Sequence, residues 1–140
     1  MSRVQLAINV ENLDEAIDFC SRLFDAVPAK VKPSYANFAI AEPPLKLVLF
    51  ENQGKGGSIN HLGVEVQTTE EVLTAEDRLT RADMVTTGID ETQCCYAEKT
   101  EVWVDGPDGV RWEWYVKHAD SDQFENVVID PSQSKRKCCT

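Results

Sequence analysis

The stretch QLAINV at residues 5–10 returns as HLGVEV at residues 61–66, and this repeat decides the fold. In both stretches apolar residues alternate with polar or small ones, a pattern that predicts a strand. The shift of 56 residues that aligns the two stretches also places Glu15 on Glu71. A chain that repeats itself over this distance is predicted to contain two copies of one supersecondary unit.

A helix is predicted after each repeated strand. Asn12 and Glu15 form a start that resembles a capping box, and apolar residues then recur at helical spacing, with Cys20 among them as an expected core residue. Thr68 and Glu71 open the second helix in the same way.

Further strands follow the first helix. Residues 35–40 and 45–50 predict two strands joined through the proline-rich residues 42–44, and a short strand is expected near residues 29–32. The predicted fold class is therefore α+β, with two tandem modules of βαββ order, or βαβββ where the short strand forms.

The composition favours one compact domain. A chain of 140 residues, 42% of them hydrophobic, is long enough to bury its own core. We expect this domain to span residues 1–118, with one module at about residues 1–53, the other at about residues 57–118, and a flexible glycine-rich connector at 54–57. Residues 119–140 are mostly polar and are predicted to form a loosely ordered tail.

The net charge of −10 argues against nucleic acid or an anionic membrane as a partner. The sequence has no apolar run of transmembrane length and no signal-peptide pattern. We therefore expect a cytoplasmic protein with reduced thiols.

Cysteine usage is unusual. Five cysteines in 140 residues would give about 0.14 adjacent pairs by chance, yet the chain has Cys94-Cys95 and Cys138-Cys139. A disulfide between neighbours would distort the intervening peptide, whereas two nearby thiolates suit one soft, thiophilic centre. The alternative at this point is a pair of small, semi-buried residues.

The position of Cys94-Cys95 in the repeat predicts a loop. Late in each copy the best alignment changes to a shift of 64 residues, which places Leu49 on Glu113, so the second copy has about eight more residues before Glu101. The cysteine pair lies in this interval. Because neighbouring strand residues point to opposite faces, two adjacent thiols converge only from a turn or loop, and we expect an added loop here.

Three strands carry a ligand-type side chain that faces away from an apolar row: Gln5, His61 and Glu113. The repeat makes Gln5 and His61 equivalent and places apolar Leu49 opposite Glu113, so a symmetric set of four ligands is reduced to three. Three protein ligands with open positions are typical of a catalytic metal. The mixed nitrogen and oxygen set is close to the two-His-one-carboxylate triad of non-haem Fe(II) oxygenases.

Each ligand also has a structural interpretation. A lone glutamine on a strand is commonly solvated or hydrogen-bonded, and a glutamate between two tryptophans fits the polar face of an edge strand. Glu51, Glu65 and His118 compete as ligands, although His118 lies outside the repeat and is expected at the surface.

These features resemble a known family. Two βαβββ units, the three ligand positions and the sequence GPDG at residues 106–109 resemble the vicinal-oxygen-chelate superfamily of glyoxalases, bleomycin resistance proteins and extradiol dioxygenases. Residues 35–40, 43–49, 60–66 and Cys94-Cys95 are similar to organoarsenical C–As bond lyases and the related cadmium-induced proteins. The resemblance implies a glyoxalase-like curved sheet around a metal site.

The resemblance also implies a chemistry. It describes an Fe(II)-dependent dioxygenase that cleaves the carbon–arsenic bond of trivalent organoarsenicals such as methylarsonous acid or reduced aromatic arsenicals, giving arsenite and resistance. Iron on Gln5, His61 and Glu113 would bind molecular oxygen, with other divalent metals able to occupy the site in vitro, while Cys94 and Cys95 hold arsenic as a dithiolate. Tyr96 would help to close the loop, and a homodimer is expected.

Two alternatives stay open. In the first, both cysteine pairs, including a second thiophilic site at Cys138 and Cys139, sequester cadmium or arsenite without catalysis. In the second, the protein is a glyoxalase-like isomerase that uses Ni(II) or Zn(II), against which the loss of the fourth ligand argues.

Overall fold

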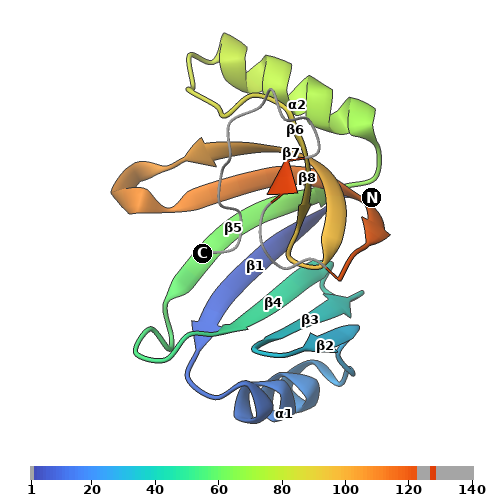
Figure 1. The fold of residues 1–140 in the computed structure, drawn as a ribbon, viewed down its shortest axis with the longest axis vertical. Coiled ribbons are helices and arrows are strands. Elements are labelled where there is room, and N and C mark those ends of the chain that lie inside the picture. Colours follow the sequence, from blue (N-terminus) through green and yellow to red (C-terminus); the bar gives the residue numbers. More distant parts are fainter. Residues whose placement is uncertain (1, 123–126, 129–140) are drawn as a thin grey trace. The chain divides into compact units, whose positions relative to one another are not determined.

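The computed structural model describes residues 2–122 and 127–128. Packing divides the chain into two compact units, residues 3–62 and, with Ser2, the residues from Gly63 on. We call these the first and the second unit and describe each by itself (Figure 1). Among the described residues no helix is long and apolar enough to cross a membrane.

The predicted βαβββ order is confirmed in both halves. The first half comprises β1 (Arg3–Val10), α1 (Leu13–Phe24), β2 (Lys30–Lys32), β3 (Tyr35–Ile40) and β4 (Leu45–Glu51). The second comprises β5 (Ile59–Val66), α2 (Thr69–Arg81), β6 (Asp90–Cys94), β7 (Ala97–Asp105), a short 3₁₀ turn η1 (Pro107–Gly109) and β8 (Arg111–Asp120), and a short β9 (Val127–Val128) follows.

The boundary between the compact units falls inside β5, between Leu62 and Gly63. The sequence repeat marks where the motif restarts, whereas packing marks which residues share a core, so the two divisions need not coincide. Strand β8 runs to Asp120, and β9 pairs with Thr92 and Gln93 of β6. Residues 123–126 and 129–140 of the predicted tail lie outside the described residues.

Both helices begin where the sequence predicts. The Asn12 side chain accepts a hydrogen bond from the Glu15 amide at 2.9 Å, and the Thr68 hydroxyl accepts one from the Glu71 amide at 3.2 Å. Each contact satisfies one of the backbone donors that a helix leaves without an intrahelical acceptor.

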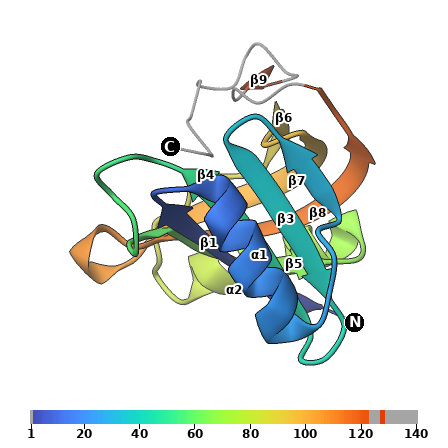
Figure 2. The same ribbon diagram turned by 90° about the horizontal axis from the view of Figure 1, so that it is seen from below.

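Helix α1 packs on one face of the first unit's sheet. The strands lie in the order β2-β3-β4-β1, with β1 parallel to β4 and the other pairs antiparallel. Cys20 lies in the core between α1 and the sheet, as predicted, together with Leu13, Ala36, Phe38, Ile40, Leu47 and Leu49. Figure 2 shows α1 lying across the strands of this unit.

In the second unit, helix α2 likewise packs on one face of the sheet. Its strands lie in the order β8-β7-β6-β9. Val72 of α2 packs against Val66, Val102 and Val116, with Trp114 partly buried beside them. The pairing of β7 with β8 shifts register between Glu98 and Lys99. Because Trp114 and Val116 pack with Val72 of α2, both lie on the helix side of β8. Strand alternation then places Glu113 and Tyr115 on the other side.

The predicted equivalence of Leu49 and Glu113 is wrong. Leu49 lies in the helix-packed core, whereas Glu113 lies on the face away from the helix. The connection from β7 to β8 is longer than that from β3 to β4, so the alignment shifts again across the turn. With β3 aligned on β7, strand pairing places Lys46 at the position of Glu113, and Lys46 also pairs with Gln5. The fourth position therefore holds a buried lysine, which as a cation is no better a metal ligand than leucine.

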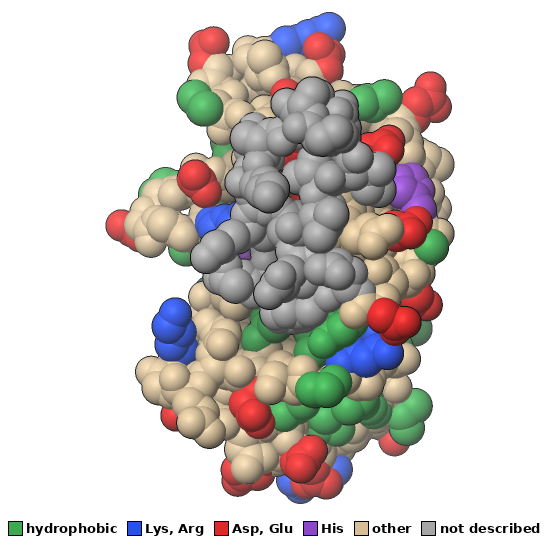
Figure 3. All heavy atoms as spheres, in the orientation of Figure 1, with side chains coloured by type: hydrophobic (Ala, Val, Ile, Leu, Met, Phe, Trp, Pro, Cys, Tyr) green, Lys and Arg blue, Asp and Glu red, His purple; other side chains and the backbone are tan. Residues whose placement is uncertain are grey.

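Helix α1 buries only one side. Phe19, Leu23, Val27 and Val31 of the first unit are all more than half exposed. In Figure 3 hydrophobic side chains gather over the region of β2 and β3. The first unit therefore carries apolar surface beyond what its own helix covers.

The glycine-rich connector is a hydrogen-bonded turn rather than the flexible segment that we predicted. The Glu11 carboxylate accepts hydrogen bonds from the amides of Gly54, at 2.8 Å, and Gly56, at 3.0 Å. A Cβ on Gly56 would lie 2.6 Å from the Glu11 side chain, so the close approach requires glycine. The hydrogen bond from Gly54, followed by that from Gly56, lowers the pKa of Glu11.

We expect Glu11→Gln to destabilise the protein in a pH-dependent way. Because the folded state lowers the pKa of Glu11, its carboxylate stabilises the fold above the ordinary carboxyl pKa, and this contribution disappears as the pH falls through the lowered value. Urea midpoints should therefore be lower in the variant than in the parent at pH 7, and the difference should shrink as the pH falls below the ordinary carboxyl pKa. The exposed Glu91, changed to Gln, is the control. A pH-independent difference would contradict the role of the charge.

Candidate functional site

Gln5 of β1 and His61 of β5 meet in the first unit. Both side chains are buried, with 5% and 2% of their surface exposed. The Gln5 amide nitrogen donates a hydrogen bond to His61 Nε2 at 3.2 Å. The two residues that the repeat makes equivalent are thus in contact.

The His61 ring presents Nε2 as an acceptor. Its Nδ1 lies 2.8 Å from Asn60 Oδ1, so Nδ1 carries the proton and donates to that oxygen. A metal ion at Nε2 would fit this tautomer, and Gln5 would have to turn its amide to offer the oxygen. Among the described residues no group of three or more His, Cys, Asp or Glu side chains is placed to hold a metal ion.

Glu113 of β8 lies in the second unit, beside a buried lysine. Lys99 Nζ donates to Glu113 Oε1 at 2.5 Å and lies 3.4 Å from Glu101 Oε2. All three side chains are buried. Burial raises the pKa of Glu101 to about 8, an effect that the Lys99 ammonium opposes and the Glu113 carboxylate reinforces. One cation therefore serves two carboxyl groups, and Glu113, with the shorter contact, is the better paired.

Strand alternation places Cys94 on the same face as Glu113. Trp103 pairs with Glu113 and Thr92 pairs with Lys99, and cross-strand partners share a face. Two steps along β6 from Thr92 lies Cys94, which has no exposed surface. The face away from α2 therefore carries both a predicted metal ligand and a predicted arsenic ligand.

The cysteine pair lies at a two-residue hairpin turn, not in an added loop. Cys94 pairs with Ala97, and the two residues between them, Cys95 and Tyr96, have φ of 52° and 62°. Two successive positive φ values are typical of a type I′ turn, which matches the twist of the flanking strands. The extra residues of the second copy lengthen the connection from α2 and the hairpin itself.

The turn brings the two sulfurs together. Cys94 Sγ and Cys95 Sγ lie 3.4 Å apart. A disulfide requires about 2.05 Å, so the two are not bonded to each other. Sulfurs about 2.3 Å from a shared centre, the length of a zinc–thiolate bond, subtend roughly 95° when they are 3.4 Å apart. That angle is narrower than tetrahedral.

The other sequence candidates have structural partners or lie elsewhere. Glu51 accepts a hydrogen bond from the Leu13 amide at the start of α1 at 2.8 Å. Glu65 accepts one from the Tyr115 hydroxyl at 2.9 Å. His118, exposed as predicted, lies 2.7 Å from the Thr100 hydroxyl. The predicted pair Cys138 and Cys139 lies outside the described residues.

Sequence reasoning did not identify Lys99 as part of the sheet face that carries Glu113, the face away from α2. The available signal was its position two residues before Glu101 and four before Trp103, so the three share one side of a strand. A lysine in a row that strand alternation directs inward requires buried carboxylates.

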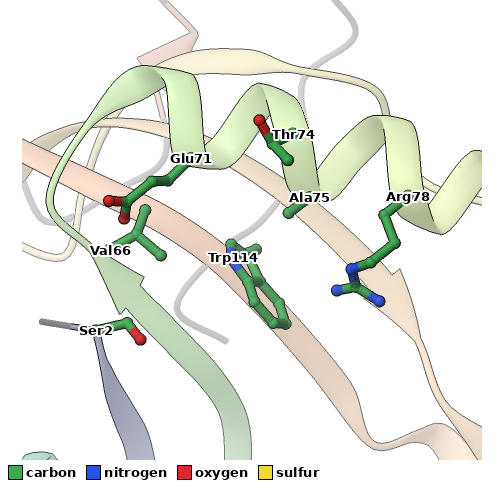
Figure 4. Close-up of a pocket in the computed structure, with 7 residues that line it drawn as sticks. All are labelled: Ser2, Val66, Glu71, Thr74, Ala75, Arg78 and Trp114. Carbon is green, nitrogen blue, oxygen red and sulfur yellow. The ribbon is translucent and has the colours of Figure 1, made fainter.

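A cavity of about 350 Å³ beside α2 is a separate feature (Figure 4). Arg78 stacks over the Trp114 ring, with 5.3 Å between the guanidinium carbon and the ring centroid. Trp114 points to the helix side of β8, away from Glu113. The cavity therefore contains none of the predicted site residues.

Residues 3–114 match the family model of the Glyoxalase/Bleomycin resistance protein/Dioxygenase superfamily. The chain belongs to this superfamily. Two solved structures agree with the fold. The Mn(II)-bound glyoxalase from Novosphingobium aromaticivorans has a TM-score of 0.59 at 16% identity, covering 88% of this chain and 43% of that one. The 2,3-dioxygenase LapB from Pseudomonas has a TM-score of 0.59 at 13% identity, covering 94% and 45%.

Two superfamily relatives are much more similar in sequence. A protein named trivalent organoarsenical cleaving enzyme, from Thermomonospora curvata, is 49% identical over 100% of this chain and 89% of its own length. A protein named cadmium-induced protein CadI, from Mycobacterium tuberculosis, is 60% identical over 89% of this chain and 82% of its own length.

The turn geometry predicts that glycine at position 96 stabilises the hairpin. Tyr96→Gly and Tyr96→Ala both remove the aromatic ring, but only glycine adopts φ of 62° without strain. The Gly variant should be more stable than the Ala variant by about 1 kcal/mol in urea unfolding. Equal stabilities would show that the turn relaxes in solution.

Removing the buried cation should be costly. Lys99→Met leaves two buried carboxyl groups without their ammonium and should lower the free energy of unfolding by about 3 kcal/mol. Adding Glu101→Gln removes one of those groups and should recover part of the loss. If the double variant is no more stable than Lys99→Met alone, the cost comes from packing rather than from charge.

Proposed function

We propose that this protein cleaves the carbon–arsenic bond of trivalent organoarsenicals, with Fe(II) held by Gln5, His61 and Glu113 and dioxygen as co-substrate. The observation that carries the proposal is the pair of cysteine residues whose sulfurs lie 3.4 Å apart at the β6–β7 turn. It gains support from the relative named trivalent organoarsenical cleaving enzyme, which matches the full length of this chain.

The thiols bind the substrate in this proposal. Each reduced thiol of Cys94 and Cys95 displaces one hydroxyl of methylarsonous acid, and its proton leaves with that hydroxyl as water. Thiolates prefer the soft arsenic centre over harder competitors. Because the turn fixes both sulfurs, the arsenical is bound with its organic group in one orientation, which supplies proximity. Tyr96, as the second turn residue, would cover the bound arsenical.

The donor set at Gln5, His61 and Glu113 suits iron. An imidazole nitrogen, an amide oxygen and a carboxylate are close to the facial triad of non-haem iron oxygenases. When bound there, iron would supply the activation of dioxygen. Lys99, released from Glu113, would keep its contact with Glu101 at 3.4 Å. The Glu101 carboxyl could then lose its proton and balance the ammonium when the Glu113 carboxylate turns to a metal.

The overall reaction balances without a further reductant. Methylarsonous acid and one dioxygen contain the atoms of one arsenous acid and one formaldehyde. The methyl carbon gives up four electrons, dioxygen takes them, and arsenic stays trivalent. Arsenite and formaldehyde are therefore expected in equal amounts.

The second candidate is sequestration of soft ions. It is favoured by the 60% identity to a protein named as cadmium-induced and by the chemistry of the thiol pair, which would also hold cadmium. A homodimer and a cytoplasmic location stay predictions.

Incubation of the reduced, iron-loaded protein with methylarsonous acid decides between the candidates. We expect arsenite in air and none under nitrogen. Cys94→Ser and Cys95→Ser should each reduce arsenite release at least about 100-fold and leave iron binding intact, whereas His61→Ala should lose iron and still bind the arsenical.

The matched control is Cys20→Ala, because Cys20 is buried under α1 and should not affect turnover. Protein that binds arsenical in air but releases no arsenite would refute cleavage and leave sequestration. Loss of iron from the serine variants would refute the separation of the thiols from the metal ligands.

A further inference from the structure

A chain of side-chain hydrogen bonds in the first unit leads from the connector to His61. The Ser58 hydroxyl donates to the Lys55 carbonyl at 2.6 Å, and Asn9 Nδ2 donates to Ser58 Oγ at 2.9 Å. Asn60 Nδ2 donates to Asn9 Oδ1 at 3.0 Å. This chain of hydrogen bonds ends at Asn60 Oδ1, which lies 2.8 Å from His61 Nδ1.

The direction of this chain is set at one end. The Lys55 carbonyl only accepts, so the single hydroxyl proton of Ser58 is committed to it. Ser58 Oγ must then accept, which fixes Asn9 with Nδ2 toward Ser58 and Oδ1 toward Asn60. Asn60 must in turn offer its Nδ2 to Asn9 and its Oδ1 to His61.

A second donor reinforces the same direction. Asn52 Nδ2 donates to Asn9 Oδ1 at 2.6 Å. Asn9 is buried, with 4% of its surface exposed, so reversing its amide would leave buried polar groups without partners. The Asn9 orientation therefore has support on both sides of the amide.

We infer that Asn60, with its direction set through Asn9 and Ser58, is a positioning residue that holds His61 in the tautomer with a proton on Nδ1 and a lone pair on Nε2. A histidine ligates a metal through an unprotonated nitrogen, and outer hydrogen bonds fix which nitrogen that is. The inference rests on the proposed metal role of His61. It adds that the segment between β4 and β5 determines whether His61 can serve as a ligand.

The tautomer can be read directly by ¹⁵N NMR of the metal-free protein. The chain has two histidines, so His118→Gln leaves His61 as the one imidazole. In this background we expect the signals of an Nδ1–H ring. Asn60→Ala should shift the populations toward Nε2–H, and Asn60→Asp, which keeps an acceptor, should retain the parent tautomer. A parent ring protonated on Nε2 would overturn the inference.

Metal affinity gives the second readout. Titration with Co(II) or Mn(II) should show that Asn60→Ala lowers the metal affinity roughly 10- to 100-fold and that Asn60→Asp lowers it much less. The matched control is Asn52→Ala, which also loses a bond to Asn9 Oδ1 but is not on the path to His61. Parent-like affinity in Asn60→Ala would overturn the inference, as would an equal loss in the control.

Ser58→Ala keeps the test falsifiable if Asn60→Ala does not fold. It removes the hydroxyl that sets the direction at one end and leaves Asn52 as the remaining donor that orients Asn9, with Asn60 and His61 in place. It should therefore give a mixture of tautomers and an intermediate metal affinity. An unchanged tautomer in Ser58→Ala would show that the hydrogen bonds from Ser58 through Asn9 do not set the direction of Asn60. If the parent shows the expected tautomer but binds no divalent metal, the proposed function fails and the assignment of Asn60 as the group that sets the ring survives.

Discussion

Strand alternation is the constraint on which the two units depend. Each strand that packs its apolar row against a helix must direct the intervening residues to the other face. In the first unit Leu47 and Leu49 lie on the helix side, and in the second unit Val102 and Val116 do. The intervening residues include Gln5, Lys99 and Glu113, and all three are buried. Polar groups buried in this way require partners, and that requirement shapes the candidate site.

The repeat was sufficient to predict this layout, but not the register of every strand. Both βαβββ units, both helix starts and the core position of Cys20 follow from spacing that the sequence shows directly. The alignment of Leu49 with Glu113 failed because insertions collect in turns, and each one changes the offset of the next strand. Only the strand pairing shows which residue occupies the fourth position, because Lys46 pairs with Ala39 as Glu113 pairs with Trp103.

The cysteine pair shows a related limit. Its rarity predicted a thiophilic site, and the requirement for convergence predicted a turn or loop. Residue counting could not distinguish a free-standing loop from a longer hairpin, because both add residues between α2 and Glu101. The hairpin places Cys94 differently from a free-standing loop, because Cys94 is the last residue of a paired strand and lies on the same face as Thr92. A thiol on a strand is held more rigidly than one in a loop, which favours one fixed geometry at the sulfurs.

The glycine-rich connector at residues 54–57 is the segment whose structure differs most from its sequence prediction. Its glycines lack the pattern of a phosphate-binding loop, and flexibility was the simplest prediction. In the structure the Glu11 carboxylate holds the Gly54 and Gly56 amides, and this fixes the turn that carries the Lys55 carbonyl. That carbonyl accepts from Ser58, and the polarity of the bonds from Ser58 to Asn9, Asn60 and His61 follows from it. A turn without a ligand-type residue of its own thus decides which nitrogen His61 presents, because hydrogen-bond direction, unlike packing, is transmitted from one side chain to the next.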